Sequence, residues 1–153
     1  ASPDAEVWSR QEGRLVGDVA RQGNHLFVAT ESRSVLALEG ASGRVLWKSL
    51  PGGLLLSGPL AAGPVVVVQT SEGTVGLDAG SGREVWRVDS VAPLAAVPGS
   101  VIVRSEYGAG AVLDPEDGSV QLDGVPGDLR PASPFVITIE DDRLLVAWRL
   151  GEV

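Results

Sequence analysis

An eleven-residue segment occurs twice in this chain, and it limits the folds that the chain can adopt. The first copy is ALEGASGRVLW at residues 37–47, and the second is GLDAGSGREVW at residues 76–86. A weaker third copy covers residues 112–122. An acidic residue followed closely by glycine suits a tight turn, because a carboxylate accepts backbone N–H groups and glycine adopts positive φ. Each copy is therefore expected to form a strand, a hairpin turn and a second strand.

The copies recur at a spacing close to 40 residues. Each contains an acidic residue, a turn glycine and a bulky residue at the end of the second strand. These positions are Glu39, Asp78 and Asp114; Gly43, Gly82 and Gly118; and Trp47, Trp86 and Leu122. A period of about 40 residues with several strands in each repeat is typical of β-propeller blades. The chain is therefore predicted to be all-β, with about four blades of four strands.

The segments between the copies supply the remaining strands. Residues 65–68 are four consecutive valines, and a strand that is apolar on both faces should lie between two packed layers. Residues 54–62 are expected to form the strand before it. One propeller domain is predicted over residues 1–153. Its blades are expected at residues 14–50, 51–90, 91–124 and 125–153.

The last blade has sequence for three strands, and the N-terminus offers a fourth. Glu6-Val7-Trp8 repeats Glu84-Val85-Trp86, so residues 5–10 are expected to be an outer strand without the rest of its blade. Pairing of this strand with the last blade would close a ring and remove exposed edges.

Three tryptophans share one position in the repeat: Trp8, Trp47 and Trp86. An indole combines a large apolar area with one N–H donor, so it can join two packed layers and bond a backbone carbonyl. With the turn glycines and the acidic residues they are predicted to dock neighbouring blades, in preference to forming an aromatic ligand patch. Trp148 is out of phase with them and is expected to pack inside a strand.

Charge and hydropathy exclude several classes of function. The net charge of −8 argues against nucleic-acid binding, which requires a basic patch, and against a polybasic membrane surface. No apolar run approaches the roughly 20 residues of a membrane-spanning helix.

The residues of catalytic and metal sites are scarce. The chain has no cysteine, and His25 is its single histidine, which excludes a histidine-based metal site within one chain. Carboxylates cluster at residues 114–117 and 140–142, but no calcium-loop pattern accompanies them, so solvated turns are the preferred interpretation. Phosphate-loop and nucleophile-elbow motifs are also missing. The sequence therefore predicts a protein that is not an enzyme and has no catalytic or metal residues.

The repeat resembles a known family. Ala37, Glu39, Ser42, Gly43 and Trp47 stand at the offsets of the docking motif of pyrroloquinoline-quinone-type (PQQ-like) β-propeller repeats. The second copy matches again, with Gly76 in place of the alanine. The resemblance extends to quinohaemoprotein dehydrogenase propellers and to BamB-like envelope propellers, and it implies architecture. The quinone enzymes need a calcium site and a vicinal cysteine pair, so no cofactor is expected for this cysteine-free chain.

Propellers with this repeat usually have seven or eight blades, and this chain has about four. A homodimer could close an eight-bladed ring, one chain could close a four-bladed ring, or the chain could be an arc of a longer protein. The preference of oligomers for two-fold symmetry favours the homodimer. The sequence does not begin with Met, which predicts a removed leader or a cut from a longer chain.

The function predicted on this basis is a non-catalytic protein-interaction scaffold, because propellers present loop-rich rims and loops carry binding sites. The scaffold would serve a bacterial envelope or other multiprotein complex through an unidentified protein partner. A ligand-binding sensor ectodomain and a fragment of a longer repeat protein are the alternatives. An envelope or secreted location is favoured over the cytoplasm.

Overall fold

The computed structural model describes residues 8–11, 13–89, 91–97, 99–105, 110–125, 128–132, 135–140 and 144–149. Side chains are described within these ranges except for Leu94, Ser105 and all residues from 122 onward. Fifteen strands and no helix occur in this part of the chain. The all-β prediction is therefore confirmed.

The strands form four antiparallel sheets in chain order. The first sheet holds β1 (Leu15–Gln22), β2 (His25–Thr30), β3 (Val35–Glu39) and β4 (Val45–Ser49). The second holds β5 (Leu60–Ala62), β6 (Val65–Thr70), β7 (Gly73–Asp78) and β8 (Glu84–Val88). The third holds β9 (Val91–Val97), β10 (Ser100–Ser105), β11 (Gly110–Leu113) and β12 (Val120–Val125). The fourth has three described strands, β13 (Asp128–Ala132), β14 (Phe135–Glu140) and β15 (Leu144–Arg149).

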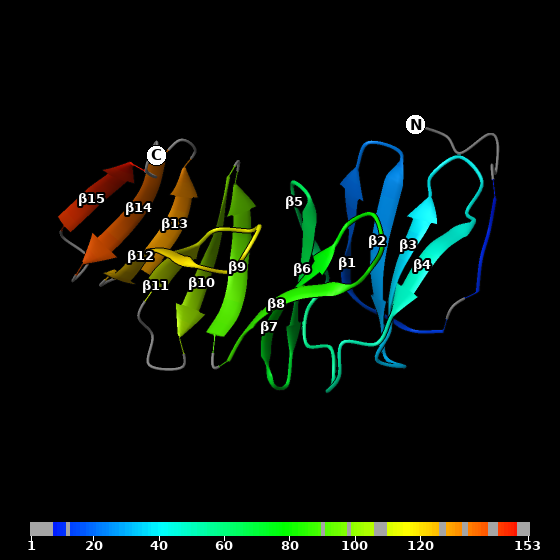
Figure 1. Cartoon of the computed structure of the whole chain (residues 1–153). Coiled ribbons are helices and arrows are strands. Elements are labelled where there is room, and N and C mark those ends of the chain that lie inside the picture. Colours follow the sequence, from blue (N-terminus) through cyan, green and yellow to red (C-terminus); the bar gives the residue numbers. More distant parts are fainter. Residues whose placement is uncertain are drawn as a thin grey trace.

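The four sheets stand side by side along an open arc (Figure 1). The first sheet lies at one end of the arc, and the three-stranded sheet lies at the other end (Figure 1). Each sheet is a meander in which every strand pairs with the next along the chain. Short hairpin turns suffice for such connections, and the glycine- and proline-rich segments of the sequence supply them.

The hydrophobic core lies between the sheets. Val66 and Val68 of β6 pack with Phe27 and other side chains of the first sheet. Val65 and Val67 point to the opposite face and pack with the third sheet. All four valines are buried, as expected for a strand between two layers. Each such side chain contributes roughly 1.5–3 kcal/mol by leaving water.

The repeat phase is visible in the strand register. Three cross-strand pairs are equivalent, and each is followed by a register shift: Ala37 with Trp47, Gly76 with Trp86 and Val112 with Leu122. The turn that joins the two strands also recurs. In each turn the amide of the glycine donates to the carbonyl of the acidic residue, at 2.7–2.8 Å, and the glycine has φ between 72° and 77°.

Two details differ from the expected strands. The strand expected at residues 54–62 is interrupted, because β5 covers only Leu60–Ala62 and Leu55 forms an isolated bridge with Thr70. Pro59 has no N–H for a ladder, and Gly58 lies so close to the first sheet that a Cβ on it would be 2.5 Å from the backbone oxygen of Asp18. Of the outer strand expected at residues 5–10, residues 8–10 are irregular and residues 5–7 lie outside the described part.

None of the described residues belongs to a helix that could cross a membrane.

Candidate functional site

Each described indole of the repeat reaches into the neighbouring sheet or turn. Trp47 of the first sheet donates its Nε1–H to the carbonyl of Ala79 at 2.9 Å. Trp86 of the second sheet donates to Pro115 at 2.6 Å. Trp8, before the first sheet, donates to Gly40 at 2.7 Å. In all three turns the acceptor directly follows the acidic residue of the repeat.

The indole rings also cover the turn glycines. A Cβ on Gly43 would lie 2.5 Å from Cδ2 of Trp8, and one on Gly118 would lie 2.8 Å from Cδ2 of Trp86. A Cβ on Gly82 would likewise fall under 3.0 Å from the ring of Trp47. Glycine is required here for two reasons, since the positive φ and the ring each disfavour a side chain.

The acidic residues hold the shape of the turns. Glu39 accepts a hydrogen bond from the hydroxyl of Ser42 at 2.7 Å and one from Arg44 at 3.3 Å. The Ser42 hydrogen bond, assisted by the charge of Arg44, lowers the pKa of Glu39. Asp78 accepts the amides of Gly80 and Ser81 at 2.9 Å through one oxygen. Asp114 accepts the amide of Glu116 at 2.8 Å. The structure thus gathers the predicted docking residues into three units of acidic residue, glycine and indole.

His25 and the clustered carboxylates are the residues that the sequence analysis weighed as metal ligands. His25 opens β2 and meets the ring of Phe27 edge-on, with ring centroids 6.3 Å apart. Asp117 accepts the amide of Ser119 at 2.9 Å, and hydrogen bonding from Ser119 lowers the pKa of Asp117. No group of three metal-ligating side chains occurs in the described residues. Of the second carboxylate cluster, residues 141–142 lie outside that part.

The connection between the first two sheets displays three leucines on the surface. Leu50, Leu54 and Leu56 are 68%, 49% and 52% exposed, whereas Leu55 between them is 7% exposed and packs in the core. The alternation across residues 54–56 follows from an extended backbone, in which successive side chains point to opposite faces. We call Leu50, Leu54 and Leu56 the leucine ridge. Leu54 and Leu56 of the ridge border a hollow of about 480 Å³ that is also lined by Val16, Glu31 and Leu55.

The backbone beneath the leucine ridge is held in place by the second sheet. The carbonyl of Leu54 accepts the amide of Ser71 at 2.8 Å, and its amide donates to the Ser71 hydroxyl at 3.0 Å. The amide of Leu56 donates to the carbonyl of Gln69 at 2.9 Å. The Arg87 guanidinium donates to the carbonyl of Pro51 at 2.5 Å and pairs with Glu84. Hydrogen bonds to the second sheet therefore hold the backbone on both sides of the Pro51-Gly52-Gly53 turn.

Sequence reasoning missed the leucine ridge. Residues 54–62 were expected to form a strand, and three consecutive leucines do not reveal which ones face water. The signal in the sequence is the Pro51-Gly52-Gly53 turn before them. A turn directly before an apolar segment can place that segment at the surface, outside the sheet.

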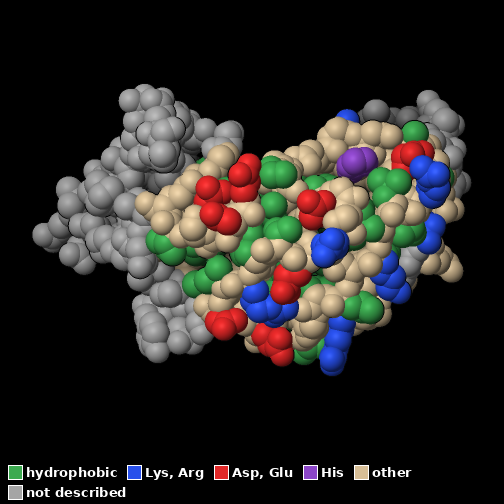
Figure 2. All heavy atoms as spheres, in the orientation of Figure 1, with side chains coloured by type: hydrophobic (Ala, Val, Ile, Leu, Met, Phe, Trp, Pro, Cys, Tyr) green, Lys and Arg blue, Asp and Glu red, His purple; other side chains and the backbone are tan. Residues whose placement is uncertain are grey.

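Charges on the face seen in Figure 2 do not form a single broad field. Acidic and basic side chains both occur there, with basic groups more frequent toward the first sheet. Such a mixed surface offers no extended basic region for a phosphate backbone.

Comparison with known proteins identifies a family model and relatives that are similar to this chain. The family model described as outer membrane protein assembly factor BamB matches residues 1–146. A protein named outer membrane protein assembly factor BamB from Shewanella oneidensis is 35% identical over 78% of this chain and 30% of its own length. One of the same name from Xanthomonas campestris is 34% identical over 99% of this chain and 38% of its own length. The chain thus spans about a third of the curated relatives it matches.

A solved structure has the same architecture. The crystal structure of BamB from Moraxella catarrhalis aligns with a TM-score of 0.71 and 20% identity, over 90% of this chain and 50% of that one. The predicted propeller of PQQ-like repeats is confirmed, and the blade count is consistent with a partial propeller. The names of the relatives also agree with the predicted preference for the cell envelope over the cytoplasm.

Proposed function

Because the chain belongs to the family of outer membrane protein assembly factor BamB, we propose that it is a non-catalytic scaffold that binds a protein of the outer-membrane assembly machinery. The relatives' names, which describe an assembly factor rather than an enzyme, support this role. The four sheets are proposed to be blades of one domain. The three indole–turn units would dock these blades to one another.

The leucine ridge is the observation that carries this proposal. Its three large apolar side chains are each exposed, and the connection that carries them is hydrogen-bonded to the second sheet. Burial of each leucine by a partner would contribute roughly 1.5–3 kcal/mol. Little of that gain would be lost to ordering, because the backbone is fixed beforehand. The partner that fits is a protein with an apolar groove or strand edge.

Site-specific photocrosslinking in native bacterial envelopes tests the proposal. A photoreactive phenylalanine at Leu54 or Leu56 should crosslink one protein of the outer-membrane assembly machinery. The same probe at Val85 or Val120, which are 46% and 56% exposed on other strands, should not capture it. Equal capture from all four positions, or no capture from the ridge, would reject the ridge as the binding surface.

A paired substitution supplies the quantitative test. Leu54→Asp with Leu56→Asp should weaken binding of the crosslinked partner by roughly 100-fold, since two carboxylates would have to be desolvated at the interface. The thermal unfolding of the isolated variant should be nearly unchanged, because both side chains face water. Leu55→Asp is not a suitable control, because its side chain is buried.

A further inference from the structure

The connection that carries the leucine ridge runs from β4 to β5, and its backbone bends at two successive glycines. Gly52 and Gly53 have φ values of 92° and 70°, in the region that glycine adopts without strain. Leu50 precedes this bend, and Leu54 and Leu56 follow it. Glycine has more backbone conformations open to it than any other residue. The direction in which Leu54 leaves the bend therefore depends on contacts with the rest of the chain.

The second sheet contacts the connection on each side of the bend. After the bend, Ser71 of the β6–β7 turn shares two hydrogen bonds with Leu54. A Cβ on Gly53 would lie 2.7 Å from the Ser71 hydroxyl oxygen, so the bend and this turn are in close contact. Before the bend, the Arg87 guanidinium of β8 donates to the carbonyl of Pro51 at 2.5 Å. Ser71 thus holds one side of the bend, and Arg87 holds the other.

Two carboxylates hold the Arg87 side chain in turn. One guanidinium nitrogen lies 2.7 Å from Glu84 on the same strand, and the other lies 3.4 Å from Glu72 of the β6–β7 turn. The Arg87 side chain is 27% exposed, so water surrounds only part of the group. A planar guanidinium directs its N–H donors at several acceptors in fixed directions, whereas a lysine ammonium is a point charge on a flexible stem.

The first sheet shows that the repeat itself does not require this arrangement. By strand register, Arg87 occupies the position that Lys48 has in the first sheet. Glu84 likewise stands where the first sheet has Val45. Lys48 is exposed, so the same kind of strand forms with a lysine in water at this position. Arg87 therefore has a purpose beyond the fold of its own sheet, and its bond to Pro51 indicates which one.

We propose that Arg87 positions the leucine ridge, because it holds Pro51 so that Leu54 and Leu56 leave the glycine bend in their exposed arrangement. The effect on binding rests on the proposed scaffold function, in which the ridge meets the protein partner. Without the guanidinium, the glycines would let the connection adopt other directions, and a partner would have to order it at a cost in affinity. Arg87 acts through the ridge and not by touching the partner.

Amide hydrogen exchange followed by NMR tests this positioning without any partner. Arg87→Gln should raise the exchange rates of the Leu54 and Ser71 amides by about 10-fold, because the bonds between these residues open more often. Arg87→Lys should raise them similarly, since an ammonium does not replace the fork, and Lys48 shows that such a strand accommodates lysine. Arg83→Gln is the matched control. Arg83 is exposed just before β8, so its loss removes the same charge and should leave both amides unchanged.

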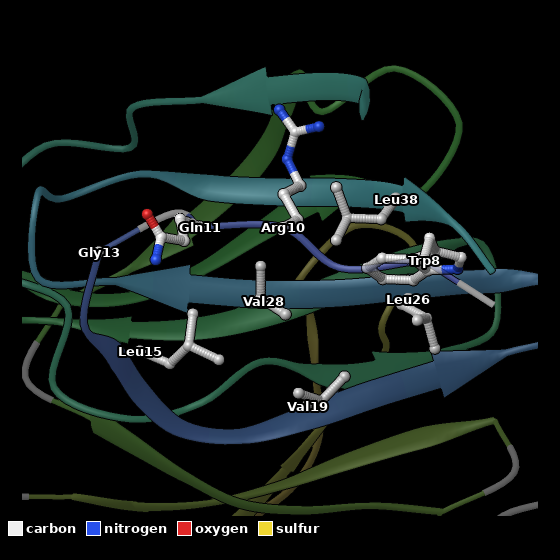
Figure 3. Close-up of a pocket in the computed structure, with 9 residues that line it drawn as sticks. All are labelled: Trp8, Arg10, Gln11, Gly13, Leu15, Val19, Leu26, Val28 and Leu38. Carbon is white, nitrogen blue, oxygen red and sulfur yellow. The ribbon is translucent and has the colours of Figure 1, made fainter. Parts of the chain in front are cut away.

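A spin label compares the ridge with a second apolar surface of the chain. Figure 3 shows this surface, a groove of about 530 Å³ whose lining includes Trp8, Leu15 and Val19. Val19 is 49% exposed, much like Leu56 at 52%. The chain has no cysteine, so Leu56→Cys and Val19→Cys each carry a single label. Arg87→Gln should increase the mobility of the label at position 56 and leave that at position 19 unchanged.

Photocrosslinking in bacterial envelopes measures the effect on binding. With a photoreactive phenylalanine at Leu54, Arg87→Gln should reduce the amount of captured outer-membrane assembly protein by about 10-fold. In a Leu56→Ala background the further loss caused by Arg87→Gln should be clearly smaller, because part of the surface that Arg87 positions is already missing. Equal losses in the two backgrounds would mean that Arg87 contacts the partner itself, and they would overturn the positioning role.

Two further results would overturn the inference. One is unchanged amide exchange and label mobility in Arg87→Gln. The other is undiminished capture by a variant whose ridge amides exchange faster. Failure of the scaffold function would look different, because the unaltered chain would then capture no protein from the ridge. The exchange rates and label mobilities would in that case decide alone whether Arg87 positions the ridge.

Discussion

At the scale of single residues, two separate effects require glycine in the turns: the positive φ of the backbone and the contact with an indole ring. Two glycines of this chain allow the cost of each effect to be measured. Gly82 and Gly99 have the same φ of 77°. A Cβ on Gly82 would meet the indole of Trp47, whereas a Cβ on Gly99 would have no heavy atom within 4 Å. Backbone strain is therefore common to both positions, and steric conflict belongs to Gly82 alone.

Substitution of each glycine by alanine, in two separate variants, should separate the cost of backbone strain from the cost of steric conflict. Gly99→Ala should lower the free energy of unfolding by about 1–2 kcal/mol, the cost of a left-handed residue. Gly82→Ala should lower it by roughly 2–5 kcal/mol, because the methyl group also displaces the Trp47 ring. Urea unfolding of the two variants measures the difference. Equal losses would show that the ring moves away without cost.

The Glu39 carboxylate makes stability depend on pH. The Ser42 hydroxyl and the Arg44 charge lower its pKa in the folded protein below the ordinary value of 4.5. Its contribution is therefore complete above pH 4.5, and it is lost as the pH falls through the folded-state pKa. We expect Glu39→Gln to reduce the acid-induced loss of stability below pH 4.5, measured by thermal unfolding across a pH series.

Ser42→Ala is the companion variant, since it removes the strongest cause of the shift and keeps the carboxylate. In this variant the pKa of Glu39, followed by NMR titration of the side chain, should rise toward 4.5. A pKa of Glu39 at or above 4.5 in the unaltered protein would contradict the prediction.

At the scale of elements, the third and fourth strands of the first two sheets combine a bulky residue with a small one across the ladder. Trp47 pairs with Ala37 and Trp86 with Gly76, whereas the third sheet pairs Leu122 with Val112. A Cβ on Gly76 would collide with the Trp86 ring. The sizes of the two partners are thus expected to be coupled within a sheet.

A double-mutant cycle measures that coupling. Gly76→Val alone should be strongly destabilising, because it forces Trp86 out of its position. In a Trp86→Leu background, which imitates the third sheet, the same change should cost about 1–3 kcal/mol less. Urea unfolding of the four proteins gives the coupling energy. Additive effects would show that the pair is independent and that the small residue at position 76 has another cause.

The strands and turns were largely predictable from the sequence, because the same pattern of strand and turn residues occurs in two clear copies. Turn chemistry at Glu39 to Gly43 and at Asp78 to Gly82 marks the hairpins, and the valines of β6 mark a strand buried on both faces. The carbonyls that accept the indole N–H groups could not be predicted, since they depend on how one sheet is placed on the next. The orientation of Leu54, Leu55 and Leu56 was equally hidden, because all three residues are chemically identical.

At the scale of the whole molecule, the arc of sheets leaves two kinds of apolar surface. The leucine ridge lies on the connection between two sheets, whereas the groove of Trp8, Leu15 and Val19 lies on a sheet face. The repeat predicted the number of sheets and left open how a ring of them is completed. The likeness of residues 6–8 to residues 84–86 indicates an outer strand near the N-terminus, but which strands it pairs with depends on contacts between distant segments.

The indole bonds between sheets also bear on how the chain could be rewired. The first sheet is attached to the second, and the second to the third, through a side chain and a turn carbonyl, in addition to the peptide segment that links them. The order of neighbours is thus specified twice, once by covalent linkage and once by fit. A duplicated stretch of gene that carries one sheet with its turn and its indole would bring both specifications with it, which is the property that lets such arrays grow by duplication.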